Sequence, residues 1–185
     1  MSLLDWIKVP YTRDFEKNLY LDLVLGLKTP RIIQKIPTDV LRYIQRIMEI
    51  QKLPTIKLEK SGSAGSYYGN VRTIVIDQSR MLGIVETYKG YRNTFWNVLV
   101  HELQHHKQYE SGNLCWSPAT KKVVWQGREM EITPWQAARD SDKRFKAYLN
   151  EPWEKEANEV SVLVVDYLIA EGILLTNEEI EASLN

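Results

Sequence analysis

Two histidines four residues apart, with a glutamate directly after the first, are the residues of this chain best suited to chemistry. His101, Glu102 and His105 occur in the order His-Glu-x-x-His. On an α-helix, residues four apart lie one above the other, so both imidazoles project from the same face. Such a pair can bind Zn²⁺, and the glutamate can act as general base towards water activated by the metal. The pattern predicts a zinc-dependent hydrolytic site.

The element that must position these side chains is a helix, predicted over residues 93–109. Ser111 and Gly112 follow it as a C-terminal stop. The chain has three histidines, and all of them fall within this helix. We expect His106, five residues after His101, to point away from the metal, towards a hydrogen bond or solvent.

A catalytic zinc site needs three protein ligands and one open position, so a third ligand must come from elsewhere. A later predicted helix carries two glutamates near its start, Glu154 and Glu156. They lie roughly 200° apart around the helix axis, so only one can face the metal. We favour Glu154, because Asn158 lies one turn beyond it and can hold a ligand histidine in orientation. Glu156 remains the alternative ligand.

That later helix is predicted to run from Glu151 to Glu171. Pro152 stands in its first turn and Gly172 follows its end, which is the usual asymmetry of helix boundaries. Its second half is apolar almost all round, so we expect a buried, central helix.

The remaining elements are predicted from periodicity and turn residues to form a small mixed scaffold around these two helices. We predict helices at 14–28 and 38–52, strands at 55–60 and 71–77, a turn at 61–66, a hairpin at 121–132 and a terminal helix from 176. Thr38 and Asp39 are the expected N-cap of the second helix, and Gln126-Gly127 the turn of the hairpin.

Two further features of the scaffold bear on catalysis. As an edge strand, residues 71–77 would align a peptide substrate by strand addition. Tyr109 and Tyr148 are candidate donors to the oxyanion of the reaction, and the sequence selects neither.

Composition narrows the partners and the compartment. Lys+Arg and Asp+Glu each number 24, so the formal net charge is zero and nothing draws the whole chain to nucleic acid or anionic membrane. The start of the chain lacks the pattern of a signal peptide, and no stretch is apolar for the length of a membrane span. One cysteine, Cys115, fits a reducing compartment. We therefore predict a cytoplasmic protein with a peptide or protein substrate and no nucleic-acid or membrane partner.

The two motifs together resemble the zincin metallopeptidases of the gluzincin type, including zincin-like peptidases inferred from bacterial and phage genomes. His101-Glu-Leu-Gln-His105 and the later Glu154-x-x-Ala-Asn158 carry the resemblance, which covers mainly residues 67–170. It implies that His101, His105 and Glu154 bind zinc and that Glu102 is the base. It also implies a strand-rich part before the His-Glu-x-x-His helix and a second buried helix that supplies the glutamate.

The predicted fold is a single α+β, zincin-like domain over residues 1–185, with a helical part at 1–54 and the sheet and both site helices at 55–185. The predicted function is a zinc metallopeptidase. Two alternatives stay open: a non-catalytic binding or regulatory protein with a structural metal, and a metal-dependent hydrolase of a non-peptide amide.

Overall fold

The computed structural model describes residues 36–77, 80, 91–117, 119–120, 122–130 and 142–174. The predicted helices at 14–28 and from 176 lie outside these ranges. Within them, the helices and strands follow in the order α3 (Thr38–Ile47), β1 (Thr55–Leu58), β2 (Gly65–Tyr68), β3 (Thr73–Ile76), α5 (Tyr91–Glu110), β4 (Leu114–Ser117), β5 (Lys122–Trp125), β6 (Arg128–Met130), α7 (Asp142–Leu149) and α8 (Pro152–Ala170). The architecture is mixed α+β, as predicted.

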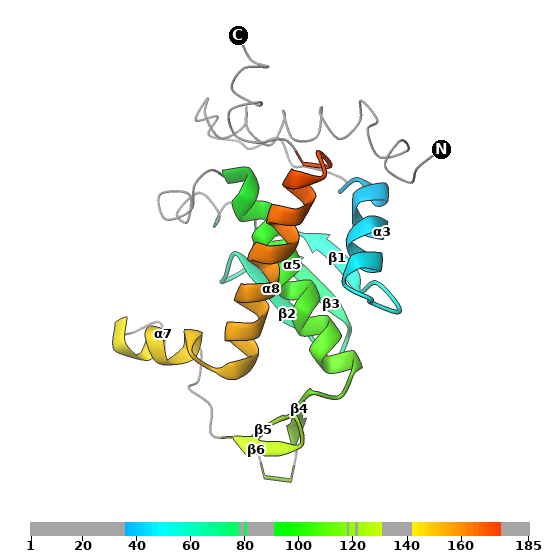
Figure 1. Ribbon diagram of the computed structural model, residues 1–185. Helices are drawn as coiled ribbons and strands as arrows, with labels where there is room; N and C mark the ends of the chain where they lie inside the picture. The colour runs from blue at the N-terminus through cyan, green and yellow to red at the C-terminus, as the bar shows by residue number, and fades with distance from the viewer. Residues whose placement is uncertain are drawn as a thin grey trace.

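Two long helices, α5 and α8, pack side by side at the centre of the described chain (Figure 1). α5 is the predicted His-Glu-x-x-His helix, and it begins and ends close to the predicted bounds. α8 starts with Pro152 at its first position, after Glu151 as N-cap. It ends before Gly172, whose φ of 67° is the left-handed conformation that favours glycine. Both predicted boundaries of α8 are confirmed.

A three-stranded sheet covers the side of α5 that faces away from α8, so α5 is the middle layer (Figure 1). The strand order is β1-β3-β2, with β1 parallel and β2 antiparallel to β3. β3 is rich in β-branched residues, and Ile74 and Ile76 are fully buried in the core beneath it. The prediction that residues 71–77 form an edge strand is wrong, because β3 is hydrogen-bonded to a strand on each side.

The edge strand nearest α5 is β2, whose first residues fall in the turn predicted at 61–66. The Gly- and Ser-rich stretch 61–66 does turn at its start, where Ser61 donates its backbone N–H to Asp77 Oδ2. From Gly65 onward, however, the chain pairs with β3. Small residues such as these are typical of a turn, but here they let β2 lie close against α5.

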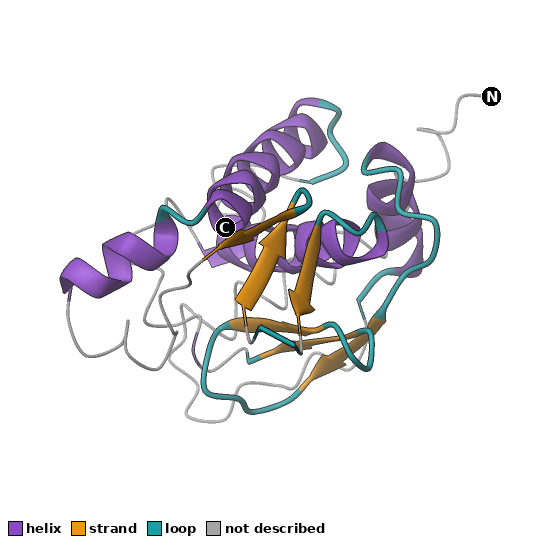
Figure 2. Ribbon diagram, turned by 90° about the horizontal axis from the view of Figure 1, so that it is seen from below, coloured by secondary structure: helices purple, strands orange, loops and turns teal. Residues whose placement is uncertain are grey.

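A second sheet, β4-β5-β6, is antiparallel throughout and lies beyond the C-terminal end of α5 (Figures 1 and 2). Its β5–β6 hairpin turns at Gln126 and Gly127, whose φ values of 47° and 77° are both positive. This confirms the predicted hairpin, since such a two-residue turn needs two left-handed residues. Trp125 of β5 packs against Trp153 at the start of α8, with ring centroids 6.3 Å apart.

α3 is shorter than the predicted helix 38–52 and is capped differently. Thr38 is its first helical residue, and the N-cap is Pro37 with no side-chain hydrogen bond, so the predicted Thr38-Asp39 cap is wrong. The helix stops because Glu49 takes a positive φ of 54°. Val40 and Ile44 of this helix and Met48 directly after it are buried, and they join the core cluster that also contains α5, α8 and β3 residues.

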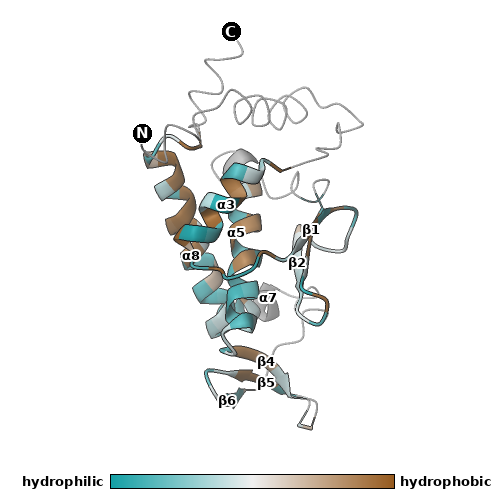
Figure 3. Cartoon of the chain, turned by 90° about the vertical axis from the view of Figure 1, so that its right-hand side faces the viewer, coloured by the Kyte–Doolittle hydropathy of each residue, from teal (hydrophilic) through white to brown (hydrophobic). Residues whose placement is uncertain are grey.

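The expectation that α8 is buried all round is wrong for one face. Ser161, Val165 and Leu168 are buried, but Leu163 is 69% exposed and Val162 is 48% exposed. Figure 3 shows the apolar colouring of the C-terminal half of α8. Among the described residues, no helix has the combination of length and hydropathy needed to span a membrane.

Candidate metal centre

The two imidazoles of the motif meet on the side of α5 that faces α8. Their Nε2 atoms lie 3.0 Å apart, and the rings are nearly perpendicular, with centroids separated by 4.6 Å. This is the consequence of the four-residue spacing on one helix. His105 is buried, whereas His101 is half-buried.

Glu154 approaches both histidines from α8. Its Oε2 lies 3.3 Å from His101 Nε2, and its Oε1 lies 3.3 Å from His105 Nε2. One oxygen or nitrogen from each of the three residues falls within a cluster no wider than 4.8 Å. The structure therefore brings together the three ligands predicted from the sequence, and it places Glu154 rather than Glu156 beside the histidines.

The three side chains fit a zinc ion in donor type and in spacing. Two imidazole nitrogens and one carboxylate oxygen form a donor set of known catalytic zinc sites. Tetrahedral bonds of about 2.0–2.1 Å would separate neighbouring ligand atoms by roughly 3.3 Å. The two Nε2 atoms lie 3.0 Å apart, and each lies 3.3 Å from a different oxygen of Glu154, so each of these neighbouring pairs is close to that value.

Electrostatic interactions between α5 and α8 shift the pKa values of two of these side chains, Glu154 and His105. Burial raises the pKa of Glu154, but hydrogen bonds from both histidines and their charges outweigh it and hold that pKa well below its usual range. Burial lowers the pKa of His105, but the hydrogen bond and negative charge of Glu154 outweigh it and raise the pKa to about 9. Without a metal, Glu154 and His105 therefore form an ion pair near neutral pH.

Glu102 lies beside this cluster, buried between α5 and the edge strand β2. Burial raises its pKa, the two histidines lower it, and the backbone N–H of Tyr67 in β2 donates a hydrogen bond to it. The approach of the strand is close: a Cβ placed on Gly65 would lie 2.7 Å from Glu102 Oε1. Only a residue without a side chain lets β2 come so near to the carboxylate.

Gln108, which no sequence motif singled out, contacts His105 on the side away from Glu154 and His101. Its side-chain oxygen lies 2.9 Å from His105 Nδ1. Its side-chain nitrogen donates to the backbone carbonyl of Trp153 at 3.0 Å and to Glu156 Oε2 at 2.7 Å. The available signal was spacing, because Gln108 stands three residues after His105 and so lies on the same helix face.

Asn158 does not take the predicted role of holding a ligand histidine in orientation. Its backbone carbonyl accepts a hydrogen bond from Ser161 Oγ. Within the described part of the chain, no hydrogen bond joins its side chain to His101 or His105, and the partner of His105 is Gln108. Asn158 lies on the same helix as Glu154, and the side chain of that helix that hydrogen-bonds to Gln108 is Glu156.

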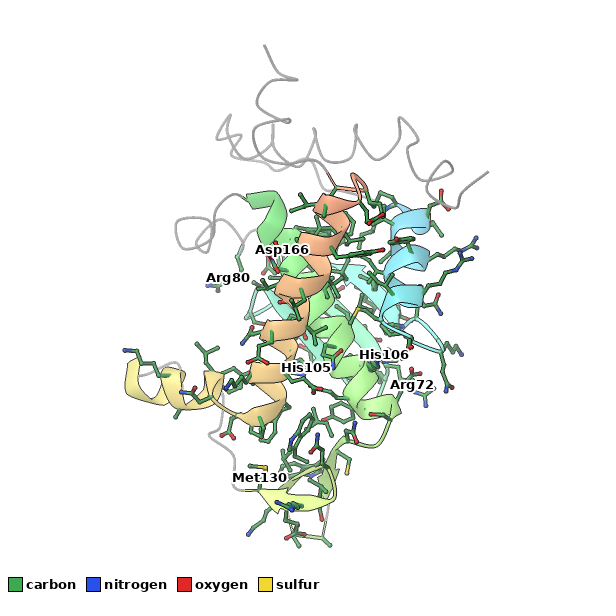
Figure 4. The ribbon with its side chains drawn as sticks, viewed as in Figure 1. Arg72, Arg80, His105, His106, Met130 and Asp166 are labelled. Carbon is green, nitrogen blue, oxygen red and sulfur yellow. The ribbon has the colours of Figure 1, made fainter. Side chains whose placement is uncertain are left out.

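His106 points away from the cluster, as expected. It is almost fully buried, its Nε2 lies 2.7 Å from the carbonyl oxygen of Lys52, and its Nδ1 lies 3.0 Å from Tyr67 Oη. In Figure 4, His105 lies where α5 passes α8, and His106 lies on the other side of α5. His106 thus ties α5 to the loop before β1 and to β2.

Of the two tyrosines considered as donors, Tyr148 lies at the cluster. Its hydroxyl donates a hydrogen bond of 2.7 Å to Glu154 Oε1. Burial and the negative charge of Glu154 raise the pKa of Tyr148, so the phenol keeps its proton. Tyr109 instead packs edge-on against Tyr67 and lies over Gly69.

Comparison with known proteins supplies no further assignment. No protein-family model matches the chain, and neither a curated protein nor a solved structure shows significant similarity to it. The function must therefore be inferred from the cluster itself.

Proposed function

We propose that this protein is a zinc-dependent metallopeptidase with a zincin-like fold. The observation that supports it is the convergence of His101, His105 and Glu154 from two helices, with the buried carboxylate of Glu102 beside them. Zn²⁺ bound there would supply a Lewis acid that polarises a carbonyl and lowers the pKa of water to about 7. The remaining chemistry falls to side chains of the chain.

Glu102 is the proposed general base. Its carboxylate is adjacent to the ligand cluster but is not one of the three ligands. Burial raises its pKa towards the working range of an acid–base catalyst. It accepts the proton of the attacking water and later delivers that proton to the leaving amine.

β2 is the proposed guide for the substrate, in place of the strand predicted from the sequence. It is the edge of its sheet in the described chain, and it lies against α5 beside the base. An extended peptide can add to such an edge through backbone hydrogen bonds. Because Gly65 contacts Glu102, a peptide on this edge would pass directly over the base.

Tyr148 is the proposed hydrogen-bond donor to the oxyanion. Its hydroxyl already reaches a ligand oxygen, and its raised pKa keeps it a donor. A hydroxyl donor held near developing negative charge stabilises a transition state, and the partial burial of Tyr148 reduces screening by solvent.

The metal site is tested first by metal analysis. Purified wild-type protein should retain about one zinc ion per chain after dialysis, and His101→Ala and Glu154→Ala should lose it, since each removes one of three ligands. Wild type without zinc would refute the proposal, and unchanged zinc in Glu154→Ala would refute the ligand assignment.

Catalysis is tested separately with Glu102→Gln, which keeps the size of the side chain and removes the base. It should retain zinc and lose about 10²–10⁴-fold in cleavage of a peptide library, the usual contribution of a general base. A zinc-loaded wild type that cleaves no peptide would refute a peptidase and favour the structural-metal or non-peptide alternatives.

A further inference from the structure

Gln108 occupies the junction between α5 and α8, directly behind a ligand. It is buried, and all three of its side-chain contacts are to groups that belong to, or neighbour, the metal cluster. Its side-chain oxygen lies beside His105 on its own helix. Its side-chain nitrogen donates hydrogen bonds to Trp153 and Glu156 on α8. The side chain therefore links a histidine ligand to the turn of α8 that carries Glu154.

The contacts with α8 fix which way the amide faces. A backbone carbonyl and a carboxylate can only accept hydrogen bonds. Both the Trp153 carbonyl and Glu156 Oε2 lie within 3.0 Å of the same Gln108 atom, so that atom must be the NH₂ group with its two donors. The carbonyl oxygen of the amide is then the atom that faces His105.

This orientation determines the proton on His105. The amide oxygen can only accept, so His105 Nδ1 must carry hydrogen and donate it. The neutral ring then has a free lone pair on Nε2, the nitrogen that faces His101 and Glu154. A metal needs that lone pair.

We propose that Gln108 is the positioning residue of the metal centre and that Glu156 holds it in the required orientation. Acting through His105, the pair selects the tautomer that binds metal and keeps the ligands of α5 in register with Glu154 of α8. This role rests on the metal site of the proposed function. It also assigns a structural role to Glu156, which the sequence left as the alternative third ligand.

The first test is Gln108→Met, which keeps the length of the side chain and removes its hydrogen bonds. Zinc affinity, measured by competition with a chromophoric chelator, should fall about 10–100-fold, as for other partners of ligand histidines. Cobalt-loaded protein should show an altered visible absorption spectrum, because His105 is no longer held in one orientation. Zinc affinity and a cobalt spectrum equal to wild type would overturn the proposal.

The second test exchanges the charges of the pair. Gln108→Glu places a carboxylate against Glu156 and the Trp153 carbonyl, so zinc affinity should fall at least tenfold. Adding Glu156→Gln lets the new amide donate to the new carboxylate, which still accepts from His105. The double variant should recover zinc affinity to within about tenfold of wild type, the remainder reflecting the lost donor to Trp153. If the double variant does not recover zinc affinity, the proposal is overturned. This test applies even if Gln108→Met fails to fold.

The matched control is Glu159→Gln, which removes the same charge from an exposed position on the same helix. It should leave zinc affinity unchanged, and a loss equal to that of Gln108→Glu would show that the effect is not local.

Zinc affinity is measured without any substrate, so a failure of the role proposed for Gln108 can be distinguished from a failure of the proposed peptidase function. If the wild type binds zinc but cleaves no peptide, the peptidase function is refuted and the role of Gln108 stands. If the wild type is active and Gln108→Met keeps full zinc affinity, only the role of Gln108 is refuted.

Discussion

Gly65 of β2 and Glu102 of α5 are in direct contact, and there is no room between them for a side chain. A Cβ on Gly65 would lie 2.7 Å from Glu102 Oε1 and 2.6 Å from Val98 Cγ1. The edge strand thus rests on Glu102, the proposed base.

Gly65→Ala should therefore displace Glu102 without touching a ligand. We expect zinc to be retained and kcat to fall by at least tenfold, because small displacements of a catalytic group are costly. Overpacking should also cost about 1–3 kcal/mol of unfolding free energy. Steady-state kinetics and thermal melts measure the two effects. Gly62→Ala is the control, since nothing lies within 4 Å of its Cβ position. A fully active Gly65→Ala would show that β2 does not constrain the base.

Tyr148→Phe should separate binding of the metal from stabilisation of the transition state. It removes the hydroxyl that donates to Glu154, and we expect about a 10²-fold loss of kcat with little change in zinc content. Peptide kinetics and metal analysis on the same preparation provide the comparison. Tyr109→Phe should lose far less, because that ring packs over Gly69 away from the cluster. Equal losses in both variants would contradict the assignment of Tyr148.

Removal of His106 should destabilise the fold and spare the metal. His106→Leu leaves the Tyr67 hydroxyl and the Lys52 carbonyl without their partner, at a cost of about 1–3 kcal/mol. The melting temperature should fall by roughly 2–4 °C for each kcal/mol in a chain of this length. The double variant with Tyr67→Phe should cost less than the sum of the single changes. Strict additivity, or loss of zinc in His106→Leu, would refute this account.

Stability of the metal-free protein should fall as pH rises from 6.5 to 9. The pKa of His105 is raised from 6.5 to about 9 in the folded chain, so its contribution is complete below pH 6.5 and is lost as pH passes through 9. The pKa of Glu154 is lowered, so its contribution is lost only at acid pH, outside this window. Thermal melts in a chelating buffer test the slope, which His105→Gln should abolish.

Zinc affinity should follow the opposite trend over the same window. Below pH 9 the metal must displace a proton from His105, so the apparent affinity should rise about tenfold per pH unit and then level off. Competition titrations between pH 6.5 and 10 measure it. A pH-independent affinity would mean that His105 carries no proton in the metal-free protein.

Features set by neighbouring residues were predictable from the sequence. The boundaries of α8 depend on Pro152 and Gly172, and the β5–β6 turn depends on Gln126 and Gly127. The meeting of the His101 and His105 rings on one helix face follows from helix geometry alone. Each of these depends on contacts within a few residues, so local propensity was sufficient to predict it.

Assignments that depend on how distant elements pack were harder. The Gly- and Ser-rich start of β2 looked like a turn, and β3 looked like an edge, because strand order is invisible to local pattern. Neighbour types favoured Glu154 over Glu156, but they could not assign Glu156 its contact with Gln108.

The sequence by itself therefore determined the candidate donor set: two histidines on one helix face, a glutamate beside them, and a second helix carrying carboxylates. Only the tertiary structure decided which carboxylate meets the histidines, which tyrosine joins them, and which strand lies against Glu102. The physical reason is rotation and register. Periodicity defines the faces of a helix, but the packing of α5 between α8 and the sheet selects the face that each partner sees.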